Sequence, residues 1–374
     1  MTDVEPWGVV APLVEAGDLN GGYDRVIAET GPEKVADALV AELLSRCGPA
    51  REQAVVRLEL TVPAETSIVV DIGFGPEGAT LLGTGAEADE GADVRIAYPI
   101  ADFARALYGT RGAGLHLRHD LSARWPDDPD PAEVAPLLAR RRRGIRAGHA
   151  LLRELRTAPP PLDDLAVAFG SDKWGGVHWY TQHYERHFAP LRDAPVRLLE
   201  IGIGGYDDPR AGGGSLRMWQ RYFHRGLIHG LDVHEKRLDE PRIRTIKGDQ
   251  SDGAFLDRLG AGLGGLDIVI DDGSHVNAHV LASFAALFPH VRPGGWYVIE
   301  DLQTSYWPSY GGGPSGPGTT MGLIGALLDG LHHKEYGKAP SYTDAHVTGV
   351  HVYHNIAFIE KGFNDEPGPA RKPR

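Results

Sequence analysis

The second half of the chain alternates short apolar runs with segments of helical periodicity. The apolar runs lie at residues 196–204, 227–233, 243–249, 266–272 and 295–301. Between them, the spacing of hydrophobic residues predicts helices over 215–223, 253–259 and 276–288. Strands that alternate with helices predict a parallel sheet covered by helices on both faces. In a final segment, 347–362, polar and apolar residues first alternate and a continuous apolar run follows. This pattern predicts a hairpin.

The first half has a different pattern, in which a long helical segment precedes a group of strands. Hydrophobic positions over 23–47 predict a helix that ends at Gly48 and Pro49. Strand-like runs follow at 54–62, 66–74 and 94–97, and a helix is predicted over 100–107. The half shows no cluster of nucleophile, base or metal ligands. We therefore expect a smaller α+β accessory domain that builds a subunit interface or covers the active site, with a separate lipid- or ligand-binding role as the alternative.

The change between the two halves falls near a proline-rich segment. A helix rich in arginine and leucine is predicted over 131–156, and the prolines at 159–161 then disfavour any helix. We place an accessory domain at 1–157 and a second domain at 158–374. The arginines within 140–146 are interpreted as a solvated or subunit-facing helix surface rather than a phosphate site, because they stand alone in an acidic chain.

Composition and charge exclude several classes of partner. The chain of 374 residues has a net charge of −13, so a nucleic-acid backbone is not expected to bind. The N-terminus lacks the basic and apolar regions of a signal peptide, and no apolar run reaches the roughly 18 residues that span a bilayer. The single cysteine, Cys47, allows no intrachain disulfide, which agrees with a reducing compartment. We expect a cytoplasmic protein without nucleic-acid or membrane partners.

Carboxylates gather at the ends of the fourth and fifth predicted strands of the second half. Asp271 and Asp272 end one strand, and Glu300 and Asp301 end the other. If these strands are neighbours, Asp272, Glu300 and Asp301 come together, which is unfavourable without a cation. Oxygen ligands without cysteine favour Mg²⁺ over Mn²⁺ or Ca²⁺. His275, three residues after Asp272, is interpreted as a general base, with direct metal ligation as the alternative.

The ends of the first three strands of this half suit an adenosine cofactor with an amino-acid tail. The first strand turns through small residues at Gly202, and Glu200 beside this turn suits an ammonium group. Asp232 ends the second strand and suits ribose hydroxyls. Asp249 and Gln250 end the third strand and offer acceptors to an adenine amino group. An ammonium group, a ribose and an adenine together describe S-adenosylmethionine.

Seven motifs of the second half resemble those of the metal-dependent macrolide-sugar O-methyltransferases, of the mycinamicin and tylosin deoxysugar type. They are FGSDKWGGVHWYTQHYERHF (169–188), LLEIGIGGY (198–206), GGGSLRMWQRYF (212–223), HGLDV (229–233), GDQSD (248–252), DDGSH (271–275) and GGWYVIEDLQTSYWP (294–308). The resemblance implies the α/β fold of class I S-adenosylmethionine-dependent methyltransferases, with a Rossmann-like, seven-stranded, mostly parallel sheet after the accessory domain. It also implies S-adenosylmethionine and Mg²⁺ as cofactors, and a homo-oligomer, either a tetramer or a dimer.

Carried over by motif, the resemblance gives roles to individual residues. Asp272, Glu300 and Asp301 would hold Mg²⁺, and His275 would be the base. The cofactor site would be lined by Ser171, Glu200, Ser215, Asp232, Gln250 and Asp271. The acceptor would be a sugar hydroxyl of a glycosylated, macrolide-like natural product in antibiotic biosynthesis. Tyr306 and Trp307 are candidates to cover this sugar, and the glycine-rich segment 310–320 is typical of a lid.

Two other functions stay open at this stage. An NAD-dependent sugar oxidoreductase would require the motif G-x-G-x-x-G, but Asp207 occupies the third glycine position and the following connection is long. The group of carboxylates also argues against this enzyme. A non-enzymatic sugar- or lipid-binding protein would instead place the function in the first half of the chain.

Overall fold

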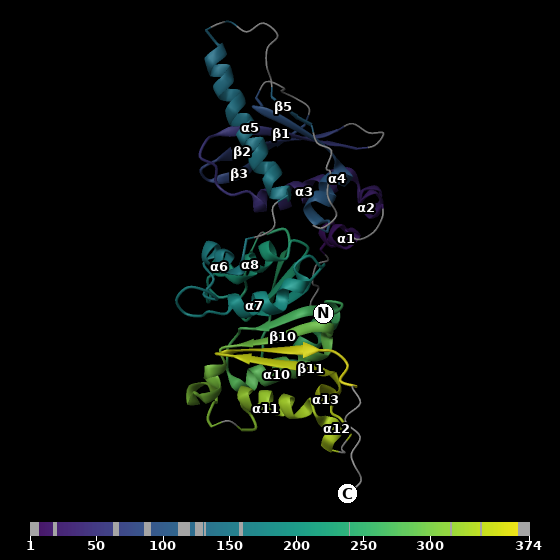
Figure 1. Cartoon of the computed structure of the whole chain (residues 1–374), viewed down its shortest axis with the longest axis vertical. Coiled ribbons are helices and arrows are strands. Elements are labelled where there is room, and N and C mark those ends of the chain that lie inside the picture. The colour runs from purple at the N-terminus through teal and green to yellow at the C-terminus, as the bar shows by residue number, and fades with distance from the viewer. Residues whose placement is uncertain are drawn as a thin grey trace. The chain divides into compact units, whose positions relative to one another are not determined.

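The computed structural model describes eleven segments of the chain, which form two compact units (Figure 1). The described residues are 7–17, 21–62, 67–85, 91–110, 120–123, 130, 132–156, 160–238, 240–314, 316–336 and 339–365. One unit comprises Pro6–Pro160 and Glu240–Arg242, and the other comprises Pro161–Asp239, Ile243–Arg374 and the first five residues. The boundary predicted between 157 and 158 lies outside the described residues and stays a prediction.

The first unit contains a five-stranded sheet in the order β3-β2-β1-β4-β5. Its strands are β1 (Ala54–Thr61), β2 (Ile68–Gly75), β3 (Gly78–Thr84), β4 (Val94–Pro99) and β5 (Asp120–Ser122). Its helices are α1 (Val10–Ala16), α2 (Gly22–Thr30), α3 (Pro32–Arg46), α4 (Ile100–Tyr108) and α5 (Val134–Arg156). β1 and β4 are parallel, and the other neighbouring strands are antiparallel. The unit is therefore an α+β domain, as predicted.

The single helix predicted over 23–47 is wrong, because the structure has two helices there. Gly31 separates α2 from α3 and has a φ of 95°, a conformation that favours glycine. Pro32 then begins α3, where its missing N–H costs no helical hydrogen bond.

The second unit contains a seven-stranded sheet in the order β11-β12-β10-β9-β6-β7-β8. The strands are β6 (Arg197–Ile201), β7 (Leu227–Asp232), β8 (Ile243–Lys247), β9 (Leu266–Asp271), β10 (Val291–Glu300), β11 (Val347–Tyr353) and β12 (Ile356–Lys361). β6 to β10 are parallel, whereas β12 runs antiparallel to both β10 and β11. The predicted seven-stranded, mostly parallel sheet, with its closing hairpin, is confirmed.

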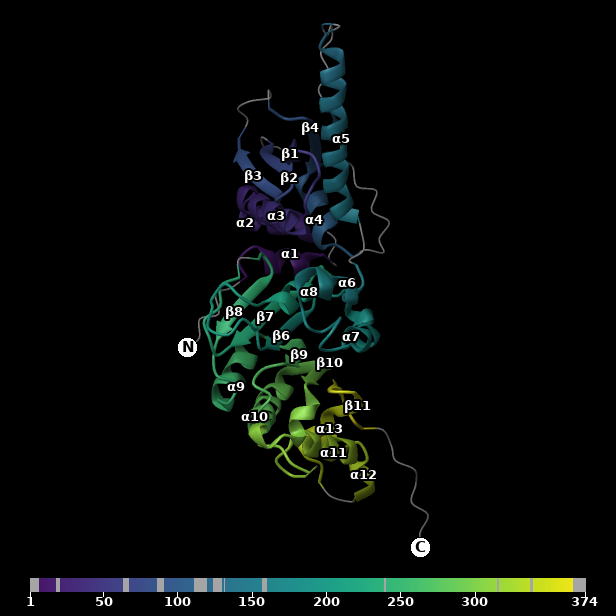
Figure 2. The ribbon, with the colours of Figure 1, turned by 90° about the vertical axis from the view of Figure 1, so that its left-hand side faces the viewer.

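Helices cover both faces of this sheet (Figure 2). They are α6 (Leu162–Phe169), α7 (Thr181–Phe188), α8 (Gly214–Tyr222), α9 (Gly253–Gly262), α10 (Asn277–Leu287), α11 (Thr320–Gly330), α12 (His333–Tyr336) and α13 (Tyr342–His346), with short 3₁₀ helices at Ala189–Leu191, Phe288–His290, Leu302–Tyr306 and Pro308–Tyr310. Successive strand residues point to opposite faces, so Ile268 and Ile270 pack toward α8 whereas Val269 packs toward α10. Among the helices of the described residues, none combines the length and the apolar character needed to cross a bilayer.

Candidate active site

Three parallel strands end side by side and carry acidic residues. β9 pairs with β6 on one side and with β10 on the other. Glu200 lies in β6, Asp272 directly follows β9, and Glu300 ends β10. The fourth and fifth predicted strands, β9 and β10, are neighbours, which is the condition for their acids to come together. The acids come from the ends of three strands rather than two.

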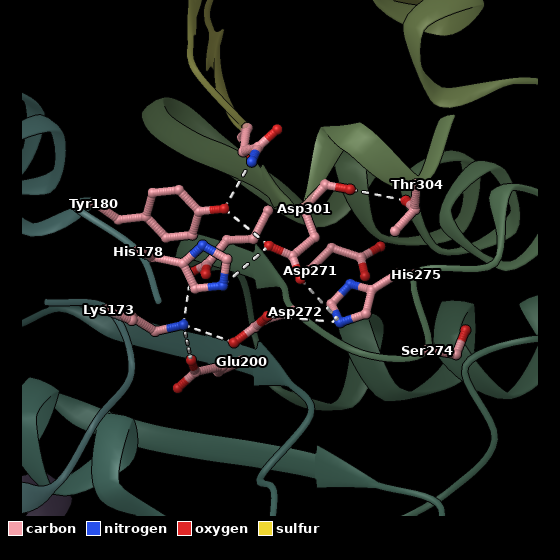
Figure 3. A network of polar contacts seen from close by, with 12 residues as sticks. Lys173, His178, Tyr180, Glu200, Asp271, Asp272, Ser274, His275, Asp301 and Thr304 are labelled. Carbon is pink, nitrogen blue, oxygen red and sulfur yellow. Dashed lines mark hydrogen bonds and ion pairs between the residues drawn. The ribbon is translucent and has the colours of Figure 1, made fainter. Parts of the chain in front are cut away.

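A buried lysine lies among these carboxylates (Figure 3). The ammonium of Lys173 lies 2.6 Å from Oδ2 of Asp272, 2.6 Å from Oε1 of Glu300 and 3.3 Å from Oε1 of Glu200. The lysine is 0% exposed. Tyr184 of α7 donates a further hydrogen bond to Oε1 of Glu300. The protein itself therefore supplies a cation to the three acids.

Burial and charge shift the pKa values in this inner group. Burial lowers the pKa of Lys173, but the charges of the three acids raise it by more, so the ammonium form is favoured. Burial, together with the charge of Asp272, raises the pKa of Glu300 well above its usual range. Burial also raises the pKa of Glu200 to about 7, although Lys173 opposes this shift. Burial therefore opposes the ionisation of Glu200 and Glu300, whereas Lys173 favours it.

Asp301 and His275 form the outer side of the site. Oδ1 of Asp301 accepts a hydrogen bond of 2.8 Å from Tyr180 and lies 3.4 Å from Nε2 of His178. Oδ2 of Asp301 lies 3.6 Å from Nε2 of His275, and the same nitrogen lies 4.0 Å from Oδ1 of Asp272. Asp272 therefore belongs to both sides, with Oδ2 toward Lys173 and Oδ1 toward His275.

The backbone of the site adopts conformations that are rare for residues with side chains. His275 and Asp301 have φ values of 56° and 54°, in the left-handed region. Non-glycine residues in this region are uncommon and concentrate at functional sites. Gly202 has a φ of 95°, and a Cβ there would lie 2.1 Å from the carbonyl oxygen of Asp272. Glycine at 202 thus lets the turn after β6 approach the end of β9.

The predicted cofactor residues at the ends of β6 and β7 are held by hydrogen bonds. Ser215, at the start of α8, donates to Oε2 of Glu200 at 2.9 Å. Oε1 of Glu200 is buried and accepts no hydrogen bond within the described part of the chain, apart from its ion pair with Lys173. The two oxygens of Asp232 accept from the backbone N–H groups of Ile203 (3.0 Å) and His234 (2.8 Å). Asp232 therefore joins the turns after β6 and β7.

Gln250 and Asp271 form a buried pair behind the loop that carries His275. Gln250 donates to Oδ1 of Asp271 at 2.6 Å and accepts from the backbone N–H of Ser274 at 2.9 Å. Asp271 is 1% exposed and also accepts from Ser283 and from Tyr297. Burial raises the pKa of Asp271 to about 6. This arrangement supports the loop that carries His275. The carboxylate of Asp271 is occupied by protein groups and is not free to bind a ligand.

The remaining predicted residues lie at the edges of the site. Asp249 is exposed and accepts hydrogen bonds from the N–H and the hydroxyl of Ser251, and the backbone bond is the main cause of its lowered pKa. Ser171 accepts a hydrogen bond of 3.4 Å from the N–H of Lys173. Tyr306 and Trp307 are 50% and 47% exposed in the loop after β10.

Sequence reasoning missed the residues that surround the acids. Lys173, His178, Tyr180 and Tyr184 all lie in the motif at 169–188, from which only Ser171 had been given a role. It also missed Lys236, which donates to the carbonyls of Tyr206, Asp208 and Ala211 and so fixes the long connection after β6. Lys173 is the single lysine of this motif, but its partners lie 99 and 127 residues away in the sequence.

Replacing Lys173 with methionine should strongly destabilise the fold. The change leaves Glu200, Asp272 and Glu300 without their buried cation, and breaking a buried ion pair costs about 3–5 kcal/mol. Urea unfolding in metal-free buffer measures the free energy of unfolding. The control is Lys247→Met, which removes an exposed lysine at the end of β8 and should change stability by less than about 0.5 kcal/mol. Equal unfolding midpoints for the two variants would show that the ammonium does not hold the acids together.

The geometry allows a metal ion on the outer side of the site. Ligand atoms of Asp272, His275 and Asp301 lie within 4.8 Å of one another, as do those of Glu200, Asp272 and Glu300. Lys173 already contacts all three acids of the second group. A divalent ion therefore fits better between the carboxylates of Asp272 and Asp301 in the first group, with the imidazole of His275 beside them. Glu300 falls in the second group, where its Oε1 is bound by Lys173 and Tyr184, so its role as a metal ligand stays a prediction.

Comparisons with known proteins connect both units to one family. A family model described as the MycE methyltransferase N-terminal domain matches residues 13–116. The chain is 42% identical to mycinamicin VI 2''-O-methyltransferase of Micromonospora griseorubida over 95% of this chain and 92% of that protein. It is 44% identical to demethylmacrocin O-methyltransferase of Streptomyces fradiae over 96% of this chain and 92% of that protein.

A solved structure agrees with these relatives. The MycE methyltransferase in complex with Mg, SAH and mycinamycin VI superimposes with a TM-score of 0.84 at 42% identity, covering 98% of this chain and 96% of that one. These relatives match the chain along almost its whole length. They belong to the family that the motifs resemble, and the solved structure has the same fold. The chain belongs to the macrolide-sugar O-methyltransferase family.

Proposed function

We propose that the chain transfers the methyl group of S-adenosylmethionine to a sugar hydroxyl of a glycosylated, macrolide-like natural product, with Mg²⁺ as cofactor. The observation that carries the proposal is the convergence of Asp272, His275 and Asp301 at the ends of β9 and β10. It occurs in a chain that is 42% identical to an enzyme named for 2''-O-methylation of mycinamicin VI.

Asp272 and Asp301 are the residues best placed to hold Mg²⁺, with Oε2 of Glu300 as a third oxygen. Their oxygens are hard ligands, as this ion prefers. A bound Mg²⁺ supplies Lewis acidity, which makes a coordinated hydroxyl a better nucleophile. Tyr180 fixes the direction of Asp301 and Lys173 fixes that of Asp272, so both carboxylates are oriented by neighbours.

His275 is the proposed general base. Its Nε2 lies 3.6 Å from Oδ2 of Asp301 and 4.0 Å from Oδ1 of Asp272, so the ring faces the acids. A sugar hydroxyl held beside these carboxylates would lie within reach of the same nitrogen, and an imidazole can take its proton as the methyl group arrives. Tyr306 and Trp307 are proposed to cover the sugar and to exclude water, because their rings are exposed in the loop after β10.

The proposed cofactor site runs along the ends of β6, β7 and β8. Glu200 is the proposed partner of the amino-acid ammonium, because its Oε1 has only the ammonium of Lys173, at 3.3 Å, as a partner among the described residues. Asp232, Asp249 and Ser171 are proposed to contact S-adenosylmethionine directly. Gly202, Ser215, Gln250 and Asp271 are proposed to shape the site, since their contacts are to other protein groups.

The function is tested by incubating the chain with labelled S-adenosylmethionine, Mg²⁺ and a panel of natural products that carry deoxysugars. The matched control is the same set of aglycones without sugars. We expect label on one or more glycosides and none on the aglycones. Label on aglycones, or on no compound, would contradict the proposed acceptor class. Stabilisation by NAD but not by S-adenosylmethionine would favour the oxidoreductase instead.

The cellular setting is part of the proposal. We propose a homo-oligomer, a tetramer or a dimer, because the resembling family is oligomeric. We also propose a cytoplasmic location, because the chain has a single cysteine, Cys47, and so forms no intrachain disulfide, which agrees with a reducing compartment. Light scattering coupled to size-exclusion chromatography tests the assembly, and a monomer at micromolar concentration would contradict it.

A further inference from the structure

One buried amide joins the loop that carries His275 to the loop that carries the exposed aromatic residues. Asn277 begins α10, two residues after His275, and is 1% exposed. The hydrogen bonds of its side chain all go to residues that follow β10, and none goes to its own helix.

The contacts use the full bonding capacity of the amide. Nδ2 donates to the carbonyl oxygens of Thr304 (3.2 Å) and Tyr310 (2.9 Å). Oδ1 accepts from the N–H (2.7 Å) and from the hydroxyl (3.0 Å) of Thr320. An asparagine has two donors and two acceptor lone pairs, so each is paired here. Among side chains of this size, only asparagine offers two donors and two acceptor lone pairs at once.

These contacts fix both ends of the glycine-rich segment. Thr304 and Tyr310 bracket the exposed rings of Tyr306 and Trp307, and Thr320 begins α11 on the far side of the segment. The backbone packs closely at this point, since a Cβ on Gly312 would lie 2.5 Å from the carbonyl oxygen of Thr304. The segment predicted to be a lid is therefore anchored at its two ends to one residue of α10.

We propose that Asn277 is a positioning residue that sets the place of the acceptor-binding loop relative to His275. The inference rests on the proposed function. A sugar held by the loop at 304–310 would meet the His275 side chain at a spacing that Asn277 fixes. A displacement of the reacting groups by about 1 Å can lower a rate about 100-fold, so loss of this anchor should lower kcat/KM for the acceptor. Asn277 contacts the acceptor-binding loop, so the affinity for the cofactor should not change.

The test compares Asn277→Ala and Asn277→Asp with Thr319→Ala. The aspartate keeps the size and the acceptors but loses both donors. Thr319 accepts from the N–H of Gly322 and caps α11, so its loss loosens the same segment without removing a bond of Asn277. Kinetics use mycinamicin VI as the probe acceptor, and calorimetry measures the affinity for S-adenosylmethionine and for Mg²⁺.

We expect kcat/KM for the acceptor to fall roughly 10- to 100-fold in both Asn277 variants. The affinities for S-adenosylmethionine and Mg²⁺ should stay within about twofold, and Thr319→Ala should keep kcat/KM within about threefold. Wild-type kcat/KM in both Asn277 variants would overturn the proposal. A parallel loss of cofactor and metal binding would also overturn it, because it would indicate general damage to the fold.

Hydrogen–deuterium exchange tests the same inference without turnover. In the Asn277 variants, exchange should rise together in peptides that cover 273–276 and 302–314, whereas Thr319→Ala should raise it only near 316–325. A rise restricted to 302–314 would refute the link to His275. If the wild-type chain methylates no glycoside, the proposed function fails. The exchange result still decides whether Asn277 links the loop of His275 to the loop at 302–314.

Discussion

His275→Ala should lose most of the methyl transfer, by about 10²- to 10⁴-fold in kcat, while S-adenosylmethionine still binds. The imidazole lies on the outer side of the site, 3.6 Å from Asp301 and 4.0 Å from Asp272. The candidate cofactor residues at the ends of β6 and β7 have no contact with it among the described residues. Removing the base should therefore slow proton removal from the sugar and leave cofactor affinity nearly unchanged. Single-turnover kinetics and calorimetry measure the two quantities separately.

His279→Ala provides the control for this change. His279 lies four residues after His275, in the first turn of α10, and its Nδ1 contacts the hydroxyl of Ser274 at 2.8 Å instead of the acids. Its kcat should stay within about threefold of the wild type. Wild-type turnover by His275→Ala would refute its role as the base. An equal loss of turnover and of cofactor affinity would indicate that the histidine supports the fold.

Asp272→Asn should weaken Mg²⁺ binding and turnover together. Asp272 lies in both groups of converging ligands, with one oxygen toward Lys173 and the other toward His275. The amide keeps the shape but removes the negative charge. Loss of a residue that only orients a metal ligand lowers metal affinity roughly 10- to 100-fold. We expect the Mg²⁺ affinity of Asp272→Asn to fall by at least this factor, because the ligand itself is changed. Part of the lost turnover should return at high Mg²⁺ concentration.

Asp257→Asn serves as the matched control, because it removes the same charge from an exposed carboxylate of α9 that contacts His290. Its Mg²⁺ affinity should equal that of the wild type within error. If Asp272→Asn loses turnover but binds Mg²⁺ normally, Asp272 acts on the reaction by another route than the metal.

Local patterns were sufficient to predict the catalytic fold. The strands of the second unit are strongly apolar because both faces of the sheet are covered, so they appear as continuous hydrophobic runs. The acids were found because parallel strands bring their carboxyl ends to one edge. By contrast, β3 was not predicted, since five of its seven residues are exposed and no alternation of burial marks it.

The partners of the acids could not be predicted, because they come from distant parts of the chain. Lys173 meets Asp272 and Glu300 only after α6 has packed against the sheet. Neighbouring residues of a strand point to opposite faces, so Asp271 faces away from Asp272, but its contacts with Ser283 and Tyr297 depend on how α10 and β10 pack. Strand periodicity gives the direction of a side chain, whereas tertiary packing decides what it meets.

Removal of the divalent ion tests the central claim most directly. The wild-type chain is incubated with labelled S-adenosylmethionine and a glycoside that the panel identifies as an acceptor, first in excess chelator and then with Mg²⁺ added beyond the chelator. Methyl transfer should fall to background in chelator and return with Mg²⁺. Turnover that is unchanged in excess chelator would contradict a metal-dependent reaction at Asp272 and Asp301.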